Sequence, residues 1–167
     1  MKHTISVLVQ NESGVLSSIS GLFSGRGYNI ESLTVAPTLD SDYSRVTIVT
    51  IGDDKVVEQI CKQLHRLIYT LKVVDVSREH SIDRELILIK VTARDDYRSE
   101  ILRIAEIFDA KIVDVSPKTY TLQFVGDEEQ VTSIIELLRP LGIKELVRSG
   151  KVAITKETQF LMNSKGA

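Results

Sequence analysis

The segment Asn11-Glu12-Ser13-Gly14-Val15-Leu16 combines residue types that suit the binding of a small ligand. Glycine lets a ligand approach the backbone closely, and the free N–H groups at the start of a helix attract a carboxylate. The side-chain oxygen of Asn11 can accept a hydrogen bond from an ammonium group, and Asn29 offers a second polar contact. A small α-amino acid carries both groups. The same residues are typical of a helix N-cap, so the residues alone leave both interpretations open.

Residues that could form a catalytic or metal site are scattered along the chain. The single cysteine, Cys61, falls in the apolar stripe of a predicted helix, which favours a buried structural residue over a nucleophile. The three histidines, His3, His65 and His80, show no HxH or HExxH spacing and are expected at the surface. The sequence therefore predicts no catalytic residue, no metal site and no cofactor of its own.

The composition is that of a globular protein without a charge signature for polyanions. The 167 residues are 43% hydrophobic and 26% charged, with 21 Lys and Arg against 23 Asp and Glu. The resulting net charge of -2 disfavours nucleic acid and anionic membranes as partners. Apolar runs are strand-length, far below the ~20 residues that span a bilayer, and the first ten residues lack a secretory signal. We therefore expect a cytoplasmic protein without a membrane segment.

Hydrophobic periodicity predicts the elements that position the loop at 11–16. In the first half, strands are predicted at 4–10, 28–37, 44–51 and 71–76, with helical apolar stripes at Val15, Ile19, Leu22 and Phe23 and at Val57, Ile60, Leu64 and Ile68. In the second half, strands are predicted at 84–92, 111–116 and 119–125, with a last strand region at 143–147 and 151–155, and helical faces are predicted at 101–108 and 131–138. Each half thus has the order βαββαβ.

This order predicts an α+β fold of two tandem ferredoxin-like βαββαβ domains. Each domain should be an antiparallel four-stranded sheet with both helices on one face. The polar stretch near the chain midpoint places a first domain at 1–77, a linker at 78–82, a second domain at 83–157 and a tail at 158–167. Leu8 and Val49 make the helix-free face of the first sheet apolar as well, which predicts that another sheet or chain covers it and favours a homodimer.

Two long strings in the first half closely resemble one protein family, the regulatory (small) subunits of acetohydroxyacid synthase, also called acetolactate synthase. They are NESGVLSSISGLFSGRGYNIESLTVAPT and SRVTIVTIGDDKVVEQICKQLHRLI. The second half is similar in EIFDAKIVDVSPKTYTLQF and RSGKVAI. The resemblance implies an N-terminal ACT domain, a βαββαβ module that binds amino acids at a dimer interface, followed by a second ferredoxin-like domain.

The resemblance also implies a regulatory function without chemistry. Such a subunit binds the large catalytic subunit of a thiamine-diphosphate enzyme, raises its activity and confers feedback inhibition by valine. The implied valine contacts are Asn11, Glu12, Ser13, Gly14, Val15 and Leu16 of one chain with Asn29 and Ile30 of the neighbouring chain in an ACT-domain homodimer. The chain departs from the family pattern at residues 40–43 and at Val46, and both departures are expected to lie away from this site.

Two other functions are compatible with parts of the sequence. An RNA-binding RRM domain shares the βαββαβ order, but it needs aromatic residues on its central strands, and residues 4–9 and 46–51 contain none. A free-standing amino-acid-sensing ACT protein that controls another enzyme fits the loop chemistry equally well. Only the long family strings argue against that second alternative.

Overall fold

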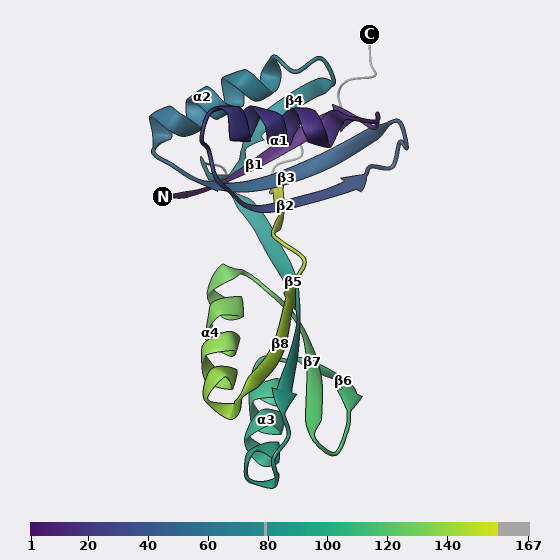
Figure 1. Ribbon diagram of the computed structural model, residues 1–167, viewed down its shortest axis with the longest axis vertical. Helices are drawn as coiled ribbons and strands as arrows, with labels where there is room; N and C mark the ends of the chain where they lie inside the picture. The colour runs from purple at the N-terminus through teal and green to yellow at the C-terminus, as the bar shows by residue number, and fades with distance from the viewer. Residues whose placement is uncertain (79, 157–167) are drawn as a thin grey trace. The chain divides into compact units, whose positions relative to one another are not determined.

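Two antiparallel sheets organise the chain in the computed structural model, which describes residues 1–78 and 80–156 (Figure 1). One compact unit is formed by the described residues up to Asp83 together with residues 151–156, and the other by Arg84–Gly150. The second unit is therefore inserted into the sequence of the first. The tail predicted at 158–167 lies outside the described residues, as does residue 157 at the end of the predicted second domain.

The first unit has the predicted order of elements. They are β1 (Lys2–Gln10), α1 (Val15–Gly25), β2 (Ile30–Pro37), β3 (Tyr43–Ile51), α2 (Asp54–His65), β4 (Thr70–Asp75) and the short η1 (Val76–Arg78). The strand order is β2-β3-β1-β4 with antiparallel neighbours, and α1 and α2 lie on one face (Figure 1). This is the ferredoxin-like arrangement that the sequence predicts.

The second unit repeats the same arrangement. Its elements are β5 (Ser81–Thr92), α3 (Asp95–Ile107), β6 (Lys111–Val115), β7 (Thr119–Gly126), α4 (Glu128–Leu138), η2 (Arg139–Leu141) and β8 (Ile143–Arg148). The order β6-β7-β5-β8 corresponds strand by strand to the first sheet, so the predicted α+β class with two ferredoxin-like units is confirmed. The last strand region, predicted at 143–147 and 151–155, forms two separate strands, β8 and β9 (Val152–Thr155). Gly150 turns the chain between them with φ 83, and β9 pairs with β5.

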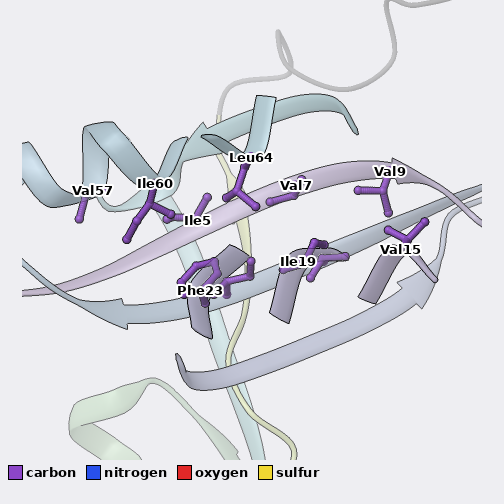
Figure 2. Close-up of a cluster of buried hydrophobic side chains, with 11 residues drawn as sticks. Ile5, Val7, Val9, Val15, Ile19, Phe23, Val57, Ile60 and Leu64 are labelled. Carbon is purple, nitrogen blue, oxygen red and sulfur yellow. The ribbon is translucent and has the colours of Figure 1, made fainter. Parts of the chain in front are cut away.

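The first core forms where the apolar stripes of α1 and α2 meet β1. Its central side chains, each at most 5% exposed, are Ile5, Val7, Val9, Val15, Ile19, Phe23, Val57, Ile60 and Leu64 (Figure 2). Burial of one such aliphatic side chain stabilises the fold by about 1.5–3 kcal/mol. Cys61 packs against this cluster, as its position in the stripe predicts. The assignment of Ile68 to the stripe was wrong, because α2 ends at His65 and leaves Ile68 86% exposed.

His3 is buried, although the sequence predicted it at the surface. Its side chain is 4% exposed, with Nδ1 3.5 Å from Oδ2 of Asp75 and Nε2 3.8 Å from Oδ1 of Asp54. The reason is topological: β1 pairs with β3 on one side and with β4 on the other, so this N-terminal strand is central in the sheet. His65 and His80 are exposed as predicted.

The face of the first sheet away from α1 and α2 is also covered. Leu8 is 8% and Val49 4% exposed, which agrees with the prediction that both faces are buried. The chain's own β9 contributes to this cover, since its residues 153–155 line a small cavity together with Ser6 and Arg45. Burial of this face therefore does not by itself require a second chain.

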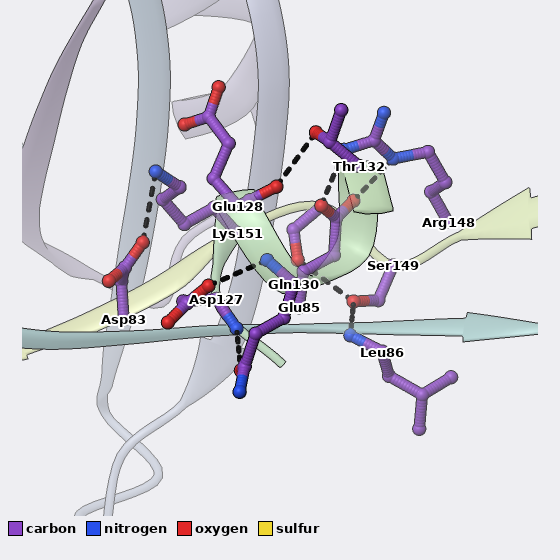
Figure 3. Close-up of polar contacts among 11 residues, drawn as sticks. Asp83, Glu85, Leu86, Asp127, Glu128, Gln130, Thr132, Arg148, Ser149 and Lys151 are labelled. Atoms are coloured by element: carbon purple, nitrogen blue, oxygen red, sulfur yellow. Dashed lines mark hydrogen bonds and ion pairs between the residues drawn. The ribbon is translucent and has the colours of Figure 1, made fainter. Parts of the chain in front are cut away.

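A buried carboxylate connects two strands of the second unit. The side chain of Glu85 is 7% exposed and accepts two hydrogen bonds from Arg148, at 2.9 Å from Nε and 2.6 Å from Nη2 (Figure 3). This hydrogen-bonded carboxylate raises the pKa of the Arg148 guanidinium. Nearby, Asp127 and Gln130 form a capping box that begins α4 (Figure 3).

Candidate ligand-binding site

A cavity of about 220 Å³ lies beside the loop between β1 and α1. It is smaller than the roughly 300–1,000 Å³ typical of sites for drug-sized ligands, so it suits a ligand of few atoms. Asn11, Glu12, Val15 and Leu16 line it as predicted, whereas Ser13 and Gly14 complete the loop without lining the cavity. The sequence analysis missed the strand residues that form the rest of the wall, which are Val9, Gln10, Val35, Ala36, Pro37, Ser44 and Val46.

Gly14 is the N-cap of α1 and has a left-handed backbone, with φ 87 and ψ -6. This conformation strains any residue with a Cβ, although no atom lies within 4 Å of the place where a Cβ would stand. No side chain caps α1, whereas Asp53 caps α2 and Asp127 caps α4. The loop therefore does contain the N-cap of α1, as that alternative predicts, but the cap is a glycine without a side-chain hydrogen bond.

The first turn of α1 has backbone donors without helical acceptors. The N–H of Ser18 donates to the carbonyl of Gly14 at 2.9 Å and begins the helical ladder. The N–H groups of Leu16 and Ser17 precede it, so the helix itself offers them no acceptor. No acidic residue occupies this turn. The positive end of the helix dipole is thus available to an anion.

No Lys, Arg or His is among the described residues that line the cavity. Arg45 stands between two lining residues of β3, but it lies on the opposite face of the strand, where burial lowers the pKa of its guanidinium. A ligand carboxylate in the cavity would therefore be bound by backbone N–H groups rather than by a cationic side chain.

Asn11 is held at two points by the turn between β2 and β3. Its backbone N–H donates to the carbonyl of Asp42 at 2.7 Å, and its Nδ2 donates to the carbonyl of Ser41 at 3.0 Å. Among the residues that the structure describes, none donates to its Oδ1, which can accept from a ligand. The expectation that residues 40–43 and Val46 lie away from the site was wrong, because the turn contacts Asn11 and Val46 lines the cavity.

Asn29 and Ile30 lie at the opposite end of β2 from the cavity. Nδ2 of Asn29 donates to Oε1 of Glu31 at 2.6 Å, and the backbone carbonyl of Asn29 accepts from Oγ1 of Thr50 at 2.6 Å. The length of β2 separates Ile30 from Pro37 by about 23 Å, at about 3.3 Å per residue. A single chain thus brings the loop residues to the cavity but not Asn29 and Ile30.

The described residues show no group of three or more His, Cys, Asp or Glu that could hold a metal ion. None of the helices in this part of the chain is long and apolar enough to cross a bilayer. The cavity combines an apolar wall with the polar side chains of Gln10, Asn11, Glu12 and Ser44, and it lies beside the N–H groups at the start of α1.

Both halves of the chain match models of known families. Residues 5–72 match the AHAS small subunit-like ACT domain, and residues 84–157 match the small subunit of acetolactate synthase. The acetolactate synthase small subunit of Aquifex aeolicus is 55% identical over 157 residues, which cover 93% of this chain and 82% of that protein. The acetolactate synthase isozyme 3 small subunit of Escherichia coli is 46% identical over 162 residues, which cover 96% of this chain and 99% of that protein.

The fold agrees with these matches. The crystal structure of the acetolactate synthase small subunit from Thermotoga maritima superimposes with a TM-score of 0.86 at 38% identity, covering 94% of this chain and 98% of that chain. The resemblance carried by the long strings of the first half is thereby confirmed. From its sequence matches in both halves and its fold, this chain belongs to the acetolactate synthase small-subunit family.

Proposed function

We propose that this chain is a non-catalytic regulatory subunit that binds the large, thiamine-diphosphate-dependent catalytic subunit of acetolactate synthase, raises its activity and confers feedback inhibition by valine. Membership of the small-subunit family supports the partnership. The observation that carries the effector assignment is the cavity beside the uncapped start of α1. Reconstitution tests the regulatory role: the chain alone should form no acetolactate, and it should raise the rate of the catalytic subunit.

The cavity matches the three parts of valine. The carboxylate would accept hydrogen bonds from the N–H groups of Leu16 and Ser17, and the ammonium would donate to Oδ1 of Asn11. The branched side chain would lie against Val35 and Val46, which line the wall. A charged side chain there would be buried without a partner, so the site should reject aspartate.

A second copy of the chain would complete the site through the edge strand β2. β2 has one register shift, near its start between Ile30 and Ser32, and residues 32–37 after it pair with β3 in regular register. The matching edge strand of the second unit, β6 (Lys111–Val115), is shorter and has its register shift in the middle, between Ile112 and Asp114, so it offers less regular edge for pairing. Antiparallel pairing of two β2 strands would place Asn29 of the partner subunit and Ile30 of the partner subunit near the cavity. We therefore propose a homodimer through the ACT domain.

Mixed dimers test this shared site. Asn11→Ala and Asn29→Ala homodimers should each bind valine about tenfold more weakly, because each substitution removes one polar contact. In a mixed dimer, one chain carries Asn11→Ala and the other carries Asn29→Ala. One site then has both substitutions and the other has neither, so titration calorimetry should find wild-type affinity at half of the sites. If the mixed dimer recovers no sites, the site is not shared. Wild-type affinity in both homodimers would place the effector elsewhere.

Valine should also stabilise the isolated chain. At ten times the dissociation constant, a ligand that binds only the folded state contributes about 1.4 kcal/mol per site. This corresponds to a rise in Tm of about 6–11 °C for a domain of about 60–100 residues, the size of the first unit. A thermal melt with valine, isoleucine, leucine, aspartate and glycine measures the effect, with aspartate and glycine as controls. If the Tm measured with valine equals the Tm measured with glycine, the effector assignment is contradicted.

A further inference from the structure

The turn between β2 and β3, residues 38–42, presents an apolar side chain to solvent; we call it the Leu39 turn. Leu39 is 98% exposed, more than any other large hydrophobic residue in the described part of the chain. Single exposed apolar residues are common on proteins and usually need no explanation. Leu39 differs from them in the way its backbone is held and in what that backbone touches.

Hydrogen bonds within the Leu39 turn fix its shape. The N–H of Thr38 donates to the carbonyl of Tyr43 at 2.9 Å, and the N–H of Tyr43 donates to the carbonyl of Asp40 at 3.1 Å. Oγ1 of Thr38 donates to the same carbonyl at 2.9 Å, and the N–H of Asp42 donates to Oδ1 of Asp40 at 3.1 Å. A side chain presented by an already ordered turn loses less conformational entropy when a partner binds it.

The Leu39 turn is also joined to the ligand cavity. Pro37, directly before the turn, and Ser44, two residues after it, both line the cavity. Asn11 donates to the turn twice, from its backbone N–H to Asp42 and from Nδ2 to Ser41. A ligand ammonium at Oδ1 of Asn11 would therefore act on the same amide group that holds the turn.

We propose that the Leu39 turn docks on the catalytic subunit, and that Asn11 couples the position of the turn to occupancy of the cavity. Leu39 is followed directly by Asp40 and, three residues on, by Asp42. The surface that fits the turn is therefore an apolar pocket for one leucine side chain with Lys or Arg on its rim. This inference rests on the proposed function, because it takes the catalytic subunit as the partner and valine as the ligand.

Titration of the catalytic subunit with this chain tests the docking surface, with acetolactate formation as the readout. Leu39→Asp should raise the small-subunit concentration for half-maximal activation by at least about tenfold, because a charge replaces the apolar anchor of the contact. The matched control is Ile68→Asp, another exposed apolar position of the first unit, at 86% exposure. Ile68→Asp should leave the half-maximal concentration unchanged. Both variants should bind valine with wild-type affinity when calorimetry is done on the isolated chain.

Amide hydrogen exchange tests the coupling. Valine should slow exchange at Thr38, Asp42 and Tyr43 in the isolated wild-type chain, because the ligand restrains Asn11 and with it the Leu39 turn. The internal control is the loop after α2, where the N–H of Leu67 donates to Leu64 at 3.2 Å and the N–H of Thr70 donates to Leu67 at 3.0 Å. Exchange in that loop should not change.

Each part of the proposal has its own contradicting result. An unchanged half-maximal concentration for Leu39→Asp, or an equal rise in both variants, overturns the docking surface. Valine protection that is equal in the two loops, or absent from the Leu39 turn, overturns the coupling. If the wild-type chain binds no valine, the proposed effector site fails instead, and the activation titration still decides the docking surface.

Discussion

Gly14→Asp is expected to lower valine affinity by at least about a hundredfold while the chain still folds. The new carboxylate would stand at the N-cap of α1, where aspartate is a favoured acceptor for the first free N–H groups of a helix. It would compete with the carboxylate of valine for the N–H groups of Leu16 and Ser17 and would repel it. Calorimetry on the isolated chain and valine inhibition of the reconstituted enzyme measure the loss. Activation of the catalytic subunit should persist.

Gly27→Asp is the matched control for this substitution. Gly27 also has a left-handed backbone, with φ 70, and no atom lies within 4 Å of the place that its Cβ would take, but it follows the end of α1 instead of preceding its start. Both variants should lose about 1 kcal/mol of stability from the left-handed conformation of a residue with a Cβ. Only Gly14→Asp should lose valine affinity. Equal losses of affinity would show that backbone strain, and not the charge at the site, is responsible.

Arg148→Met is expected to lower the free energy of unfolding by about 2–3 kcal/mol, because it leaves the carboxylate of Glu85 buried without its cation. This carboxylate is 7% exposed, so water cannot replace the two hydrogen bonds that it loses. The side chain of Arg148 is 49% exposed, so the expected loss of stability is smaller than for a fully buried pair. Urea denaturation measures the change. Valine affinity should not change, since Glu85 and Arg148 belong to the second unit.

The double variant Glu85→Gln/Arg148→Met separates loss of the pair from loss of packing. A neutral amide is less costly to bury than an unpaired carboxylate, so the double variant should regain most of the stability that Arg148→Met loses. The free energy of unfolding of Arg148→Lys should lie between those of wild type and Arg148→Met, because lysine keeps the charge but cannot make the bidentate contact with the carboxylate. A double variant as unstable as Arg148→Met would attribute the loss to packing.

The sequence predicts those parts of the fold that depend on local periodicity. The apolar spacing of Val15, Ile19 and Phe23 places α1 where the structure has it. The stripe of α2 was extended too far, because Ile68 continues the spacing after the helix has ended at His65. The burial of His3 was missed because it follows from the central place of β1 in the sheet, which residue type does not reveal.

The site was predictable only in its contiguous part. Asn11, Glu12, Val15 and Leu16 are neighbours in sequence and line the cavity together. Residues 35–37 and Ser44 reach the cavity through the pairing of β2 with β3, and Asn11 meets the turn between them through a contact 30 residues away. Such contacts depend on strand register, which hydrophobic periodicity does not fix. Ile30 entered the predicted site through family resemblance alone and Asn29 through its polar side chain as well, and the participation of both stays a prediction.

The insertion of the second unit into the first sets the order in which a ribosome completes them. β9 is synthesised only after residues 84–150, a stretch of 67 residues. At about 5–20 residues per second, the delay between the two parts of the first unit is roughly 3–13 seconds. During that interval the nascent chain already has the ligand loop and the first core, but β9 does not yet cover the sheet face near Ser6 and Arg45. Chaperones, and any large subunit that binds during translation, would thus meet this face before the chain closes it.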